Sequence, residues 1–300
     1  MTNISNTTAD TEKKCVYCVK GVVLDIAVMH FIQDWTLGVD SKMVHLHQPG
    51  LHSPIPLDMV PNSVDDKYKR CTEKMYKKVQ EEYLPNENPT EGIFKQAWMK
   101  AEGCATIEKV KKRFQKDKSN DNPEELTHDH IKAICAYTAE EPEIYSVFNQ
   151  AVRSNRTEYT TSFQFHSLHF LLTDALRLLK ENQPGCHTTY RRTNMSVKVN
   201  KVIRFGFFAS SSLDKGISKR FGDKSCFEIT TCFGAELKSF PVLGNHEKEV
   251  LIPPYEVFNV TAVLKKENDR NLWCDVYKLK NIKAPRSNLN CKLFKKTIIH

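Results

Sequence analysis

The chain has 300 residues, of which 40% are hydrophobic and 27% are charged, and its formal net charge is +8. These values are typical of a soluble globular protein that buries a sizeable core, in one large domain or two small ones. No stretch reaches the roughly 18 apolar residues that a membrane-spanning helix needs, so the sequence excludes a membrane span.

Residues 1–55 form a poorly patterned N-terminal extension. Its apolar run, 21–32, follows basic residues as in an export signal, but Asp25 interrupts the run and makes the signal poor. The stretch 45–52 contains three histidines that could bind a metal ion, although we favour a linker.

The pattern then becomes helical, from residue 63 to residue 182. Ser63 stands shortly before Asp65 and Asp66, and a serine followed by acids in a first turn predicts the start of a helix. Further along, residues 109–118 are a basic run beside a polar loop. Such a run can bind nucleic acid, but we interpret it as a solvated surface and expect no nucleic-acid partner.

The strongest predicted helix covers residues 157–182. Its apolar residues recur at spacings of three and four, which predicts one buried stripe made of Phe165, Leu168, Leu172, Ala175, Leu176 and Leu179. His166 and His169 lie in the same helix. A histidine pair at this spacing could bind a metal ion, but without a third ligand nearby we favour hydrogen-bonded, partly buried histidines.

After Pro184 and Gly185 the character changes to short strands. β-Branched and aromatic segments separated by turn residues predict strands at 197–204, 207–210, 226–233, 249–252, 257–264 and 273–279. Helices followed by strands indicate an α+β fold, with residues 56–183 mainly helical and 184–295 mainly strands. No glycine-rich loop follows a strand, so a nucleotide site of the Rossmann kind is excluded.

The segment 246–255 carries the clearest chemical signal. Glu247 and Glu249 stand two apart at the head of an apolar run, and alternate residues of an extended strand project from the same face. Two such acids suit chemistry at a cationic centre, for example the oxocarbenium formed when a glycosidic bond breaks. The alternative is an exposed strand end with solvated acids.

Two upstream segments give this pair a context. Residues 188–191, Thr-Thr-Tyr-Arg, place an arginine on the first predicted strand, and residues 204–213 end an aromatic strand in three serines. In this order the three segments resemble the arginine-specific mono-ADP-ribosyltransferases of the vertebrate extracellular type, which carry an arginine, serine, Glu-x-Glu signature. The resemblance covers about residues 55–295 and includes the segments 57–59, 65–68, 167–173, 231–235 and 249–255.

The resemblance implies a catalytic role for four residues. Arg191 would bind the NAD phosphates through its guanidinium, and Ser210 would hold the nicotinamide ribose. Glu249 would stabilise the positive charge that develops as nicotinamide leaves. Glu247 would orient the acceptor guanidinium and help to remove its proton. Relatives that mainly hydrolyse NAD have glutamine at this last position, so the glutamate favours transfer to arginine.

Three further residues are implied at the cofactor. Tyr137, at the end of a predicted helix, would border the nucleotide, unless it is only a core tyrosine. Phe207 stands where some relatives carry a glutamine near the nucleotide. Ser239 belongs to a loop that is slightly longer than usual, which leaves its contact with the ligand open. Arg192 follows the signature arginine where the family commonly has glycine, so we expect the local turn to differ.

Ten cysteines and five glycosylation sequons fit an oxidising compartment. By resemblance, Cys71 pairs with Cys291 and Cys186 with Cys232, and Cys226–Cys274 is a plausible third disulfide. Cys15-x-x-Cys18 could be half of a zinc site, but no second pair has metal-ligand spacing.

The sequence therefore predicts a helical N-terminal part packed on a strand-rich NAD-binding core. The expected activity is transfer of ADP-ribose from NAD or NADP to arginine side chains of target proteins, without a metal ion, by an extracellular, secreted monomer. Two alternatives remain open: an NAD glycohydrolase, and a catalytically silent binding protein on the same fold.

Overall fold

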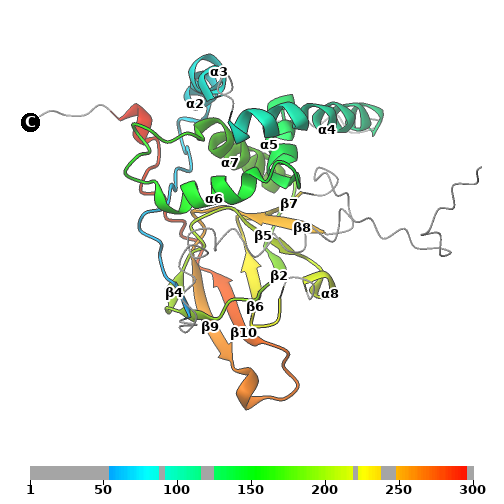
Figure 1. The fold of residues 1–300 in the computed structure, drawn as a ribbon, viewed down its shortest axis with the longest axis vertical. Helices are drawn as coiled ribbons and strands as arrows, with labels where there is room; N and C mark the ends of the chain where they lie inside the picture. Colours follow the sequence, from blue (N-terminus) through cyan, green and yellow to red (C-terminus); the bar gives the residue numbers. More distant parts are fainter. Residues whose placement is uncertain (1–53, 88–91, 116–124, 219–221, 238–247, 296–300) are drawn as a thin grey trace, which may run out of the picture.

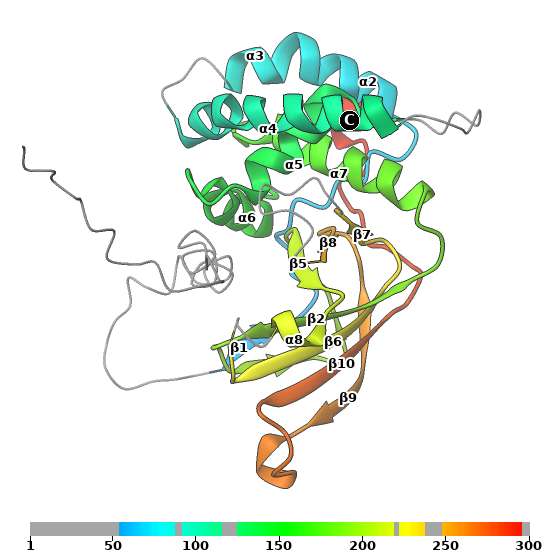
Figure 2. The same cartoon turned by 90° about the vertical axis from the view of Figure 1, so that its right-hand side faces the viewer.

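The computed structural model describes residues 54–87, 92–115, 125–218, 222–237 and 248–295. Helices gather in one layer and strands in the other, as Figures 1 and 2 show from two sides. The predicted α+β class is confirmed. The extension before residue 54 lies outside the described residues, and so do the side chains of the basic run 109–118.

The helical layer is built from elements between residues 72 and 181. A π-helical stretch, η2, joins the first two helices into one run. The elements are α2 (Thr72–Lys78), η2 (Val79–Tyr83), α3 (Leu84–Glu87), α4 (Ile93–Gln115), α5 (His128–Thr138), α6 (Ile144–Ser154) and α7 (His166–Glu181). A further short helix, α8 (Lys215–Ser218), lies among the strands. None of the helices in the described ranges is both long and apolar enough to cross a bilayer.

The strands form an eight-stranded mixed sheet with the order β4-β9-β10-β6-β2-β5-β8-β7. Within this eight-stranded sheet, β10 and β6 are the only described neighbours that run parallel. The strands are β2 (His187–Thr193), β4 (Val202–Ile203), β5 (Ala209–Ser212), β6 (Ser225–Thr231), β7 (Ala235–Glu236), β8 (Glu249–Ile252), β9 (Phe258–Leu264) and β10 (Asp275–Asn281). A strand occurs in each predicted range, although 197–204 divides into β3 (Val197–Val199) and β4. The strand predicted at 207–210 begins two residues later, as β5, and the other bounds shift by up to two residues, except those of β8.

One strand precedes the helices. β1 (Ile55–Leu57) pairs in parallel with β3, and Ile55 and Leu57 are both buried. The described part of the chain therefore starts beside the strands, crosses to the helical layer and then returns to the strands. The predicted order of helices followed by strands did not include this first strand.

The predicted helix start at Ser63 is wrong, because its polar side chains make tertiary contacts instead of capping a helix. The Ser63 hydroxyl donates to the Gly206 carbonyl (2.7 Å), and Asp65 pairs with Arg204. Gly206 has φ +73, and a Cβ there would lie 2.7 Å from that of Val60, so this close approach requires glycine. The first helix, α2, begins only at Thr72.

The strongest predicted helix is confirmed in type but begins nine residues late, at His166 rather than 157. The N–H groups of His166 and Ser167 donate to the Glu87 carboxylate (2.7 and 3.0 Å), which caps the helix from α3. Tyr159 is fully buried in the preceding turns and its hydroxyl donates to Asp66 (2.8 Å). The predicted apolar stripe is buried along its whole length.

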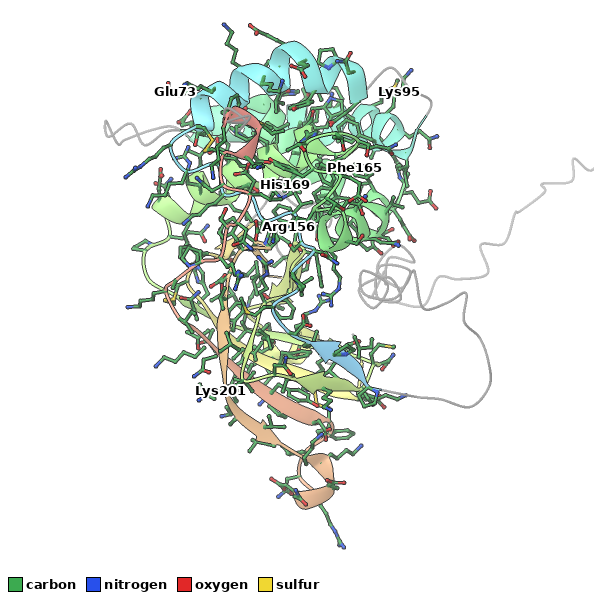
Figure 3. All side chains as sticks on the ribbon, turned by 90° about the vertical axis from the view of Figure 1, so that its left-hand side faces the viewer. Glu73, Lys95, Arg156, Phe165, His169 and Lys201 are labelled. Atoms are coloured by element: carbon green, nitrogen blue, oxygen red, sulfur yellow. A yellow bond between two sulfur atoms is a disulfide. The ribbon has the colours of Figure 1, made fainter. Side chains whose placement is uncertain are left out.

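His169 lies inside the helical layer, on the side toward the sheet (Figure 3). Its Nε2 lies 3.0 Å from the Val64 carbonyl, and its Nδ1 lies 2.7 Å from the Tyr68 hydroxyl. A carbonyl can only accept, so Nε2 carries the hydrogen and Nδ1 accepts from Tyr68. The expectation that His169 is hydrogen-bonded is confirmed, although the residue is fully rather than partly buried. His166 is also buried and its ring stacks on Tyr83, but its Nδ1 has no hydrogen-bond partner among the described residues, so the expectation of a hydrogen-bonded side chain is wrong there.

Four disulfides connect the described cysteines. Cys71–Cys291, Cys186–Cys232 and Cys226–Cys274 confirm the pairings that the family resemblance implied. Cys104–Cys135, which links α4 to α5, was not predicted. Cys15 and Cys18 lie outside the described residues.

Candidate active site

Three of the four expected catalytic residues lie on three neighbouring strands. Arg191 is in β2, Ser210 in β5 and Glu249 at the first residue of β8, and the order β2-β5-β8 is continuous in the sheet. The Arg191 guanidinium donates from Nη1 to the Ser210 backbone carbonyl (2.8 Å). The sheet thus places three segments that are far apart in the sequence on neighbouring strands.

The three serines of β5 differ in environment. Ser210 is partly exposed, whereas Ser211 and Ser212 are buried. The Ser211 hydroxyl donates to the Val250 carbonyl (3.0 Å), and the Ser212 hydroxyl accepts from the backbone N–H of Asp214 (3.0 Å). Of the three, Ser210 is therefore the one best placed to meet a ligand.

Ser212 is a further candidate site residue, one that the sequence did not single out. It lies directly opposite Glu249 in the antiparallel pairing of β5 and β8, and directly opposite residues project from the same face. Ser210 shares that face because alternate strand residues point the same way. The signal was present in the sequence as two serines at a spacing of two.

Glu249 is only 3% exposed, so its carboxylate is held in a largely water-excluded position. The residue before it, Lys248, has φ +46, and β8 begins after it. The Lys248 carbonyl accepts from the N–H of Leu213 (3.0 Å). The expectation that an extended strand carries Glu247 and Glu249 on one face is therefore wrong in its premise, because the residue between them is left-handed. Glu247 itself lies outside the described residues.

Tyr137 stands at the end of α5, as the sequence predicted, and is 4% exposed. Its hydroxyl donates to the Phe208 carbonyl (2.7 Å) and accepts from the Asn149 side-chain amide (2.9 Å). Burial raises the pKa of Tyr137 above its usual range. The Glu249 carboxylate raises that pKa further, and the Arg191 guanidinium lowers it. Tyr137 therefore lies within electrostatic reach of both charged site residues.

Phe207 lies in the core rather than at an open surface. It is 2% exposed, its ring centroid lies 6.1 Å from that of Phe205, and the Arg153 guanidinium lies 5.9 Å from its ring. Ser239, the other residue expected near the cofactor, lies outside the described residues.

Arg192 lies inside β2, paired with Cys226, and it is not among the described residues with a left-handed φ. This position does not need the conformational freedom of glycine, so the expected change of turn is wrong. Arg192 is 8% exposed, and burial lowers the pKa of its guanidinium.

The model of the family "NAD:arginine ADP-ribosyltransferase" matches residues 57–280 of the chain. The chain belongs to this family. It is 36% identical over 214 residues to the erythroblast NAD(P)(+)–arginine ADP-ribosyltransferase of Gallus gallus, a match that covers 69% of this chain and 67% of the relative. It is 35% identical to the human ecto-ADP-ribosyltransferase 5, with 75% of this chain and 80% of the relative covered.

The fold is also that of a solved family member. A mutant of the eukaryotic mono-ADP-ribosyltransferase ART2.2, crystallised in complex with NAD, aligns with a TM-score of 0.64 at 31% identity. The alignment covers 79% of this chain and 99% of that chain. The enzyme class and the α+β architecture of the chain follow from this membership.

The geometry of this ADP-ribosyltransferase site suits a particular ligand chemistry. The Arg191 guanidinium offers a fork of donors for phosphate oxygens, the Ser210 hydroxyl can bond a ribose hydroxyl, and the buried Glu249 carboxylate can face a developing positive charge. These are the three chemical features of NAD at its nicotinamide ribose. Among the described residues, no group of three His, Cys, Asp or Glu side chains could hold a metal ion.

Proposed function

We propose that this family member transfers ADP-ribose from NAD, or NADP, to arginine side chains of proteins, and releases nicotinamide. The observation that carries the proposal is the convergence of Arg191, Ser210 and Glu249 on the neighbouring strands β2, β5 and β8. Relatives named for NAD(P)(+)–arginine transfer support arginine as the acceptor.

In the proposed reaction the bond between ribose C1′ and the nicotinamide nitrogen breaks. The bonding pair leaves with nicotinamide, which neutralises its pyridinium charge, and positive charge builds up at C1′. Glu249 stabilises that charge, and the arginine acceptor attacks C1′ through a guanidinium nitrogen and loses one proton. Glu247 accepts this proton and orients the acceptor. Arg191 binds the phosphates, and Ser210 holds the ribose.

The burial of Glu249 supports its role. A carboxylate at 3% exposure is shielded from water, and a preorganised charge in such a site stabilises a transition state more than an exposed charge does. Removing one group of this kind typically lowers the rate about 10²–10³-fold.

The test uses NAD labelled in the adenosine part, together with a small guanidino compound as acceptor. The wild-type protein should release nicotinamide and label the acceptor, and Glu249→Gln should do both at least about 100-fold more slowly. Glu228→Gln is the matched control, because Glu228 is also a strand glutamate but pairs with Lys278 on β10. Equal rates for Glu249→Gln and wild type would refute the proposed mechanism.

Part of the proposal concerns where the protein works. Four disulfides and relatives named as ecto-enzymes support an extracellular, secreted protein, and the sequon at Asn194 lies on an exposed residue that could carry a glycan. One chain supplies Arg191, Ser210 and Glu249, so the proposed activity needs no second subunit and is compatible with a monomer. Arg192 lies in a regular strand, so its place after the signature arginine does not argue for the alternative of a catalytically silent protein.

A further inference from the structure

Lys248, which directly precedes Glu249, has a backbone conformation that lysine rarely adopts. Its φ is +46, in the left-handed region, which is crowded for every residue with a Cβ and is favoured by glycine and, to a lesser degree, asparagine. Of the six described non-glycine residues with a left-handed φ, Lys248 is the one that adjoins an expected catalytic residue. A disfavoured conformation beside a reacting group is an observation from which a functional role can be argued.

Backbone hydrogen bonds hold the chain on two sides where it enters β8. The Lys248 carbonyl accepts from the N–H of Leu213, just after β5 (3.0 Å), and the Glu249 carbonyl accepts from the N–H of Leu237, just after β7 (2.9 Å). Glu249 lies directly opposite Ser212 in the pairing of β5 with β8, and it is 3% exposed. The buried carboxylate is therefore carried by a backbone that is bonded to both neighbouring strands.

The side chain of Lys248 does not account for this conformation. Its Nζ lies 3.7 Å from Oδ2 of Asp214, and the two side chains are 56% and 40% exposed. An ion pair at such exposure contributes little to stability, so it is too weak to hold a residue in the left-handed region. The contact that depends on the direction of the backbone at Lys248 is the bond from its carbonyl to Leu213.

We propose that Lys248 is a positioning residue whose left-handed backbone begins β8 at Glu249 and keeps the Glu249 carboxylate in its buried place. An extended residue at position 248 would continue the direction of the strand, and the turn that brings its carbonyl to Leu213 would be lost. This inference rests on the proposed function, because it concerns the group that stabilises the positive charge at ribose C1′.

The first experiment replaces Lys248 by residues that differ in their tolerance of a positive φ and measures nicotinamide release from NAD. Lys248→Gly and Lys248→Asn remove the lysine side chain but keep the left-handed conformation accessible, so kcat should stay within about twofold of wild type. Lys248→Val opposes that conformation and should lower kcat about tenfold. KM for NAD should not change, because Glu249 acts on charge that develops only in the transition state.

Lys283 offers a matched control for the strain itself. It is also an exposed lysine with a left-handed φ, +57, but it follows β10, and β6, β2 and β5 separate β10 from β8 in the sheet. Lys283→Val should lower the urea midpoint of unfolding as much as Lys248→Val does, while its kcat stays at the wild-type value. An unchanged kcat in Lys248→Val, or an equal loss of kcat in Lys283→Val, would overturn the inference.

The second experiment follows the position of residue 249 without catalysis. In Glu249→Cys a thiol occupies the buried place of the carboxylate, and its alkylation by iodoacetamide can be followed by mass spectrometry of the peptide that contains residue 249. Adding Lys248→Val should raise the alkylation rate about tenfold, because the residue is no longer held in place. Adding Lys248→Gly or Lys283→Val should leave the rate unchanged.

The two experiments separate the failure of the inference from that of the function. If the wild-type protein releases no nicotinamide but the thiol responds to Lys248→Val alone, the proposed function fails and the positioning of residue 249 stands. In an active protein the inference requires both the loss of kcat and the faster alkylation in Lys248→Val. If only one of these occurs, or neither, the positioning role fails and the function stands.

Discussion

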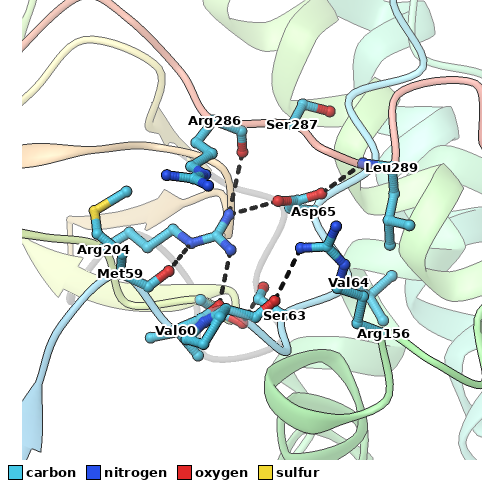
Figure 4. Close-up of polar contacts among 12 residues, drawn as sticks. Met59, Val60, Ser63, Val64, Asp65, Arg156, Arg204, Arg286, Ser287 and Leu289 are labelled. Carbon is cyan, nitrogen blue, oxygen red and sulfur yellow. Dashed lines mark hydrogen bonds and ion pairs between the residues drawn. The ribbon is translucent and has the colours of Figure 1, made fainter.

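Arg204 and Asp65 form an ion pair with an N–O distance of 2.7 Å in which both side chains are fully buried (Figure 4). Arg204 also donates to the carbonyl groups of Met59, Val60 and Arg286, and Asp65 accepts from the N–H of Leu289. The pair therefore joins the segment before α2, the start of the Ser210 segment and the C-terminal segment. Each of the two charged side chains therefore has hydrogen-bond partners in addition to the other.

We expect the loss of either charge to be strongly destabilising. Asp65→Asn or Arg204→Met leaves the remaining charge buried without its partner, which typically costs about 3–5 kcal/mol. The free energy of unfolding, from urea denaturation, measures the change. Lys77→Ala, which breaks an exposed ion pair with Glu81, should change this free energy by less than about 0.5 kcal/mol. A loss at Arg204 as small as that at Lys77 would contradict the prediction.

Glu247→Gln should separate cleavage from transfer. A glutamine retains the size of the side chain but cannot take the proton of the acceptor guanidinium. We therefore expect nicotinamide release to continue while labelling of a guanidino acceptor is lost. Parallel assays of the two products on one sample provide the measurement. Undiminished labelling would show that Glu247 does not serve the acceptor.

Two buried histidines and two buried carboxyl groups should make the stability of the protein depend on pH, with effects of opposite sign. Burial lowers the pKa of His166 to about 3 and of His169 to about 4. Below pH 6.5 these histidines therefore bind protons in the unfolded chain but stay neutral in the native state. Stability from these histidines falls as the pH falls. Burial raises the pKa of Glu87 to about 7 and of Asp66 to about 6. As the pH falls, these carboxyl groups bind protons in the native state at a higher pH than in the unfolded chain. Their contribution to the stability of the fold therefore rises as the pH falls.

Glu87→Gln removes one of the two carboxyl groups and leaves both histidines. Between pH 6.5 and 4.5 the variant should lose stability more steeply than wild type, by up to about 1.4 kcal/mol per pH unit for one proton. Urea midpoints measured at several pH values test this, with the exposed Glu81→Gln as control. Parallel curves for Glu87→Gln and wild type would mean that the carboxyl of Glu87 does not titrate in this range.

The disulfides should differ in how much they stabilise the fold. In the chain-entropy model, the Cys71–Cys291 link, with a sequence separation of 220, contributes about 5 kcal/mol, and Cys226–Cys274, with a separation of 48, about 4 kcal/mol. Replacing both cysteines of each pair by alanine and measuring urea denaturation gives the two losses. A larger loss for the shorter loop would argue that native packing, not chain entropy, dominates.

The strands, and the helix with a clear apolar stripe, were predictable from the sequence. Burial of one face makes apolar residues recur at regular spacings along such elements. β8 was predicted with its observed bounds, and the stripe of α7 was correct although the start of the helix was not. The start of α7 depends on Glu87, which lies far away in the chain, and no local pattern reports such a contact. The wrong helix start at Ser63 has the same cause. The Ser63 hydroxyl bonds to the Gly206 carbonyl and the Asp65 carboxylate bonds to Arg204, and both partners lie far away in the sequence.

The candidate site likewise contains residues that the sequence could identify and features that it could not. Arg191, Ser210 and Glu249 carry recognisable local segments, so the family resemblance could identify them. Asn149 has no such segment, because its hydrogen bonds with Tyr137 and Phe208 join separate parts of the chain. The left-handed Lys248 could not be predicted either, since lysine has no preference for that conformation.

The Cys71–Cys291 disulfide also makes the chain between these residues a covalently closed ring. Among the four disulfides it is the one that joins the helical part to the strand part, since Cys104–Cys135 lies within the first and the other two within the second. A protease that cuts once, for example in the turn at Pro184, opens the ring without separating its halves. Release of the helices from the NAD-binding strands would require a second event, either another cut or reduction of this one bond.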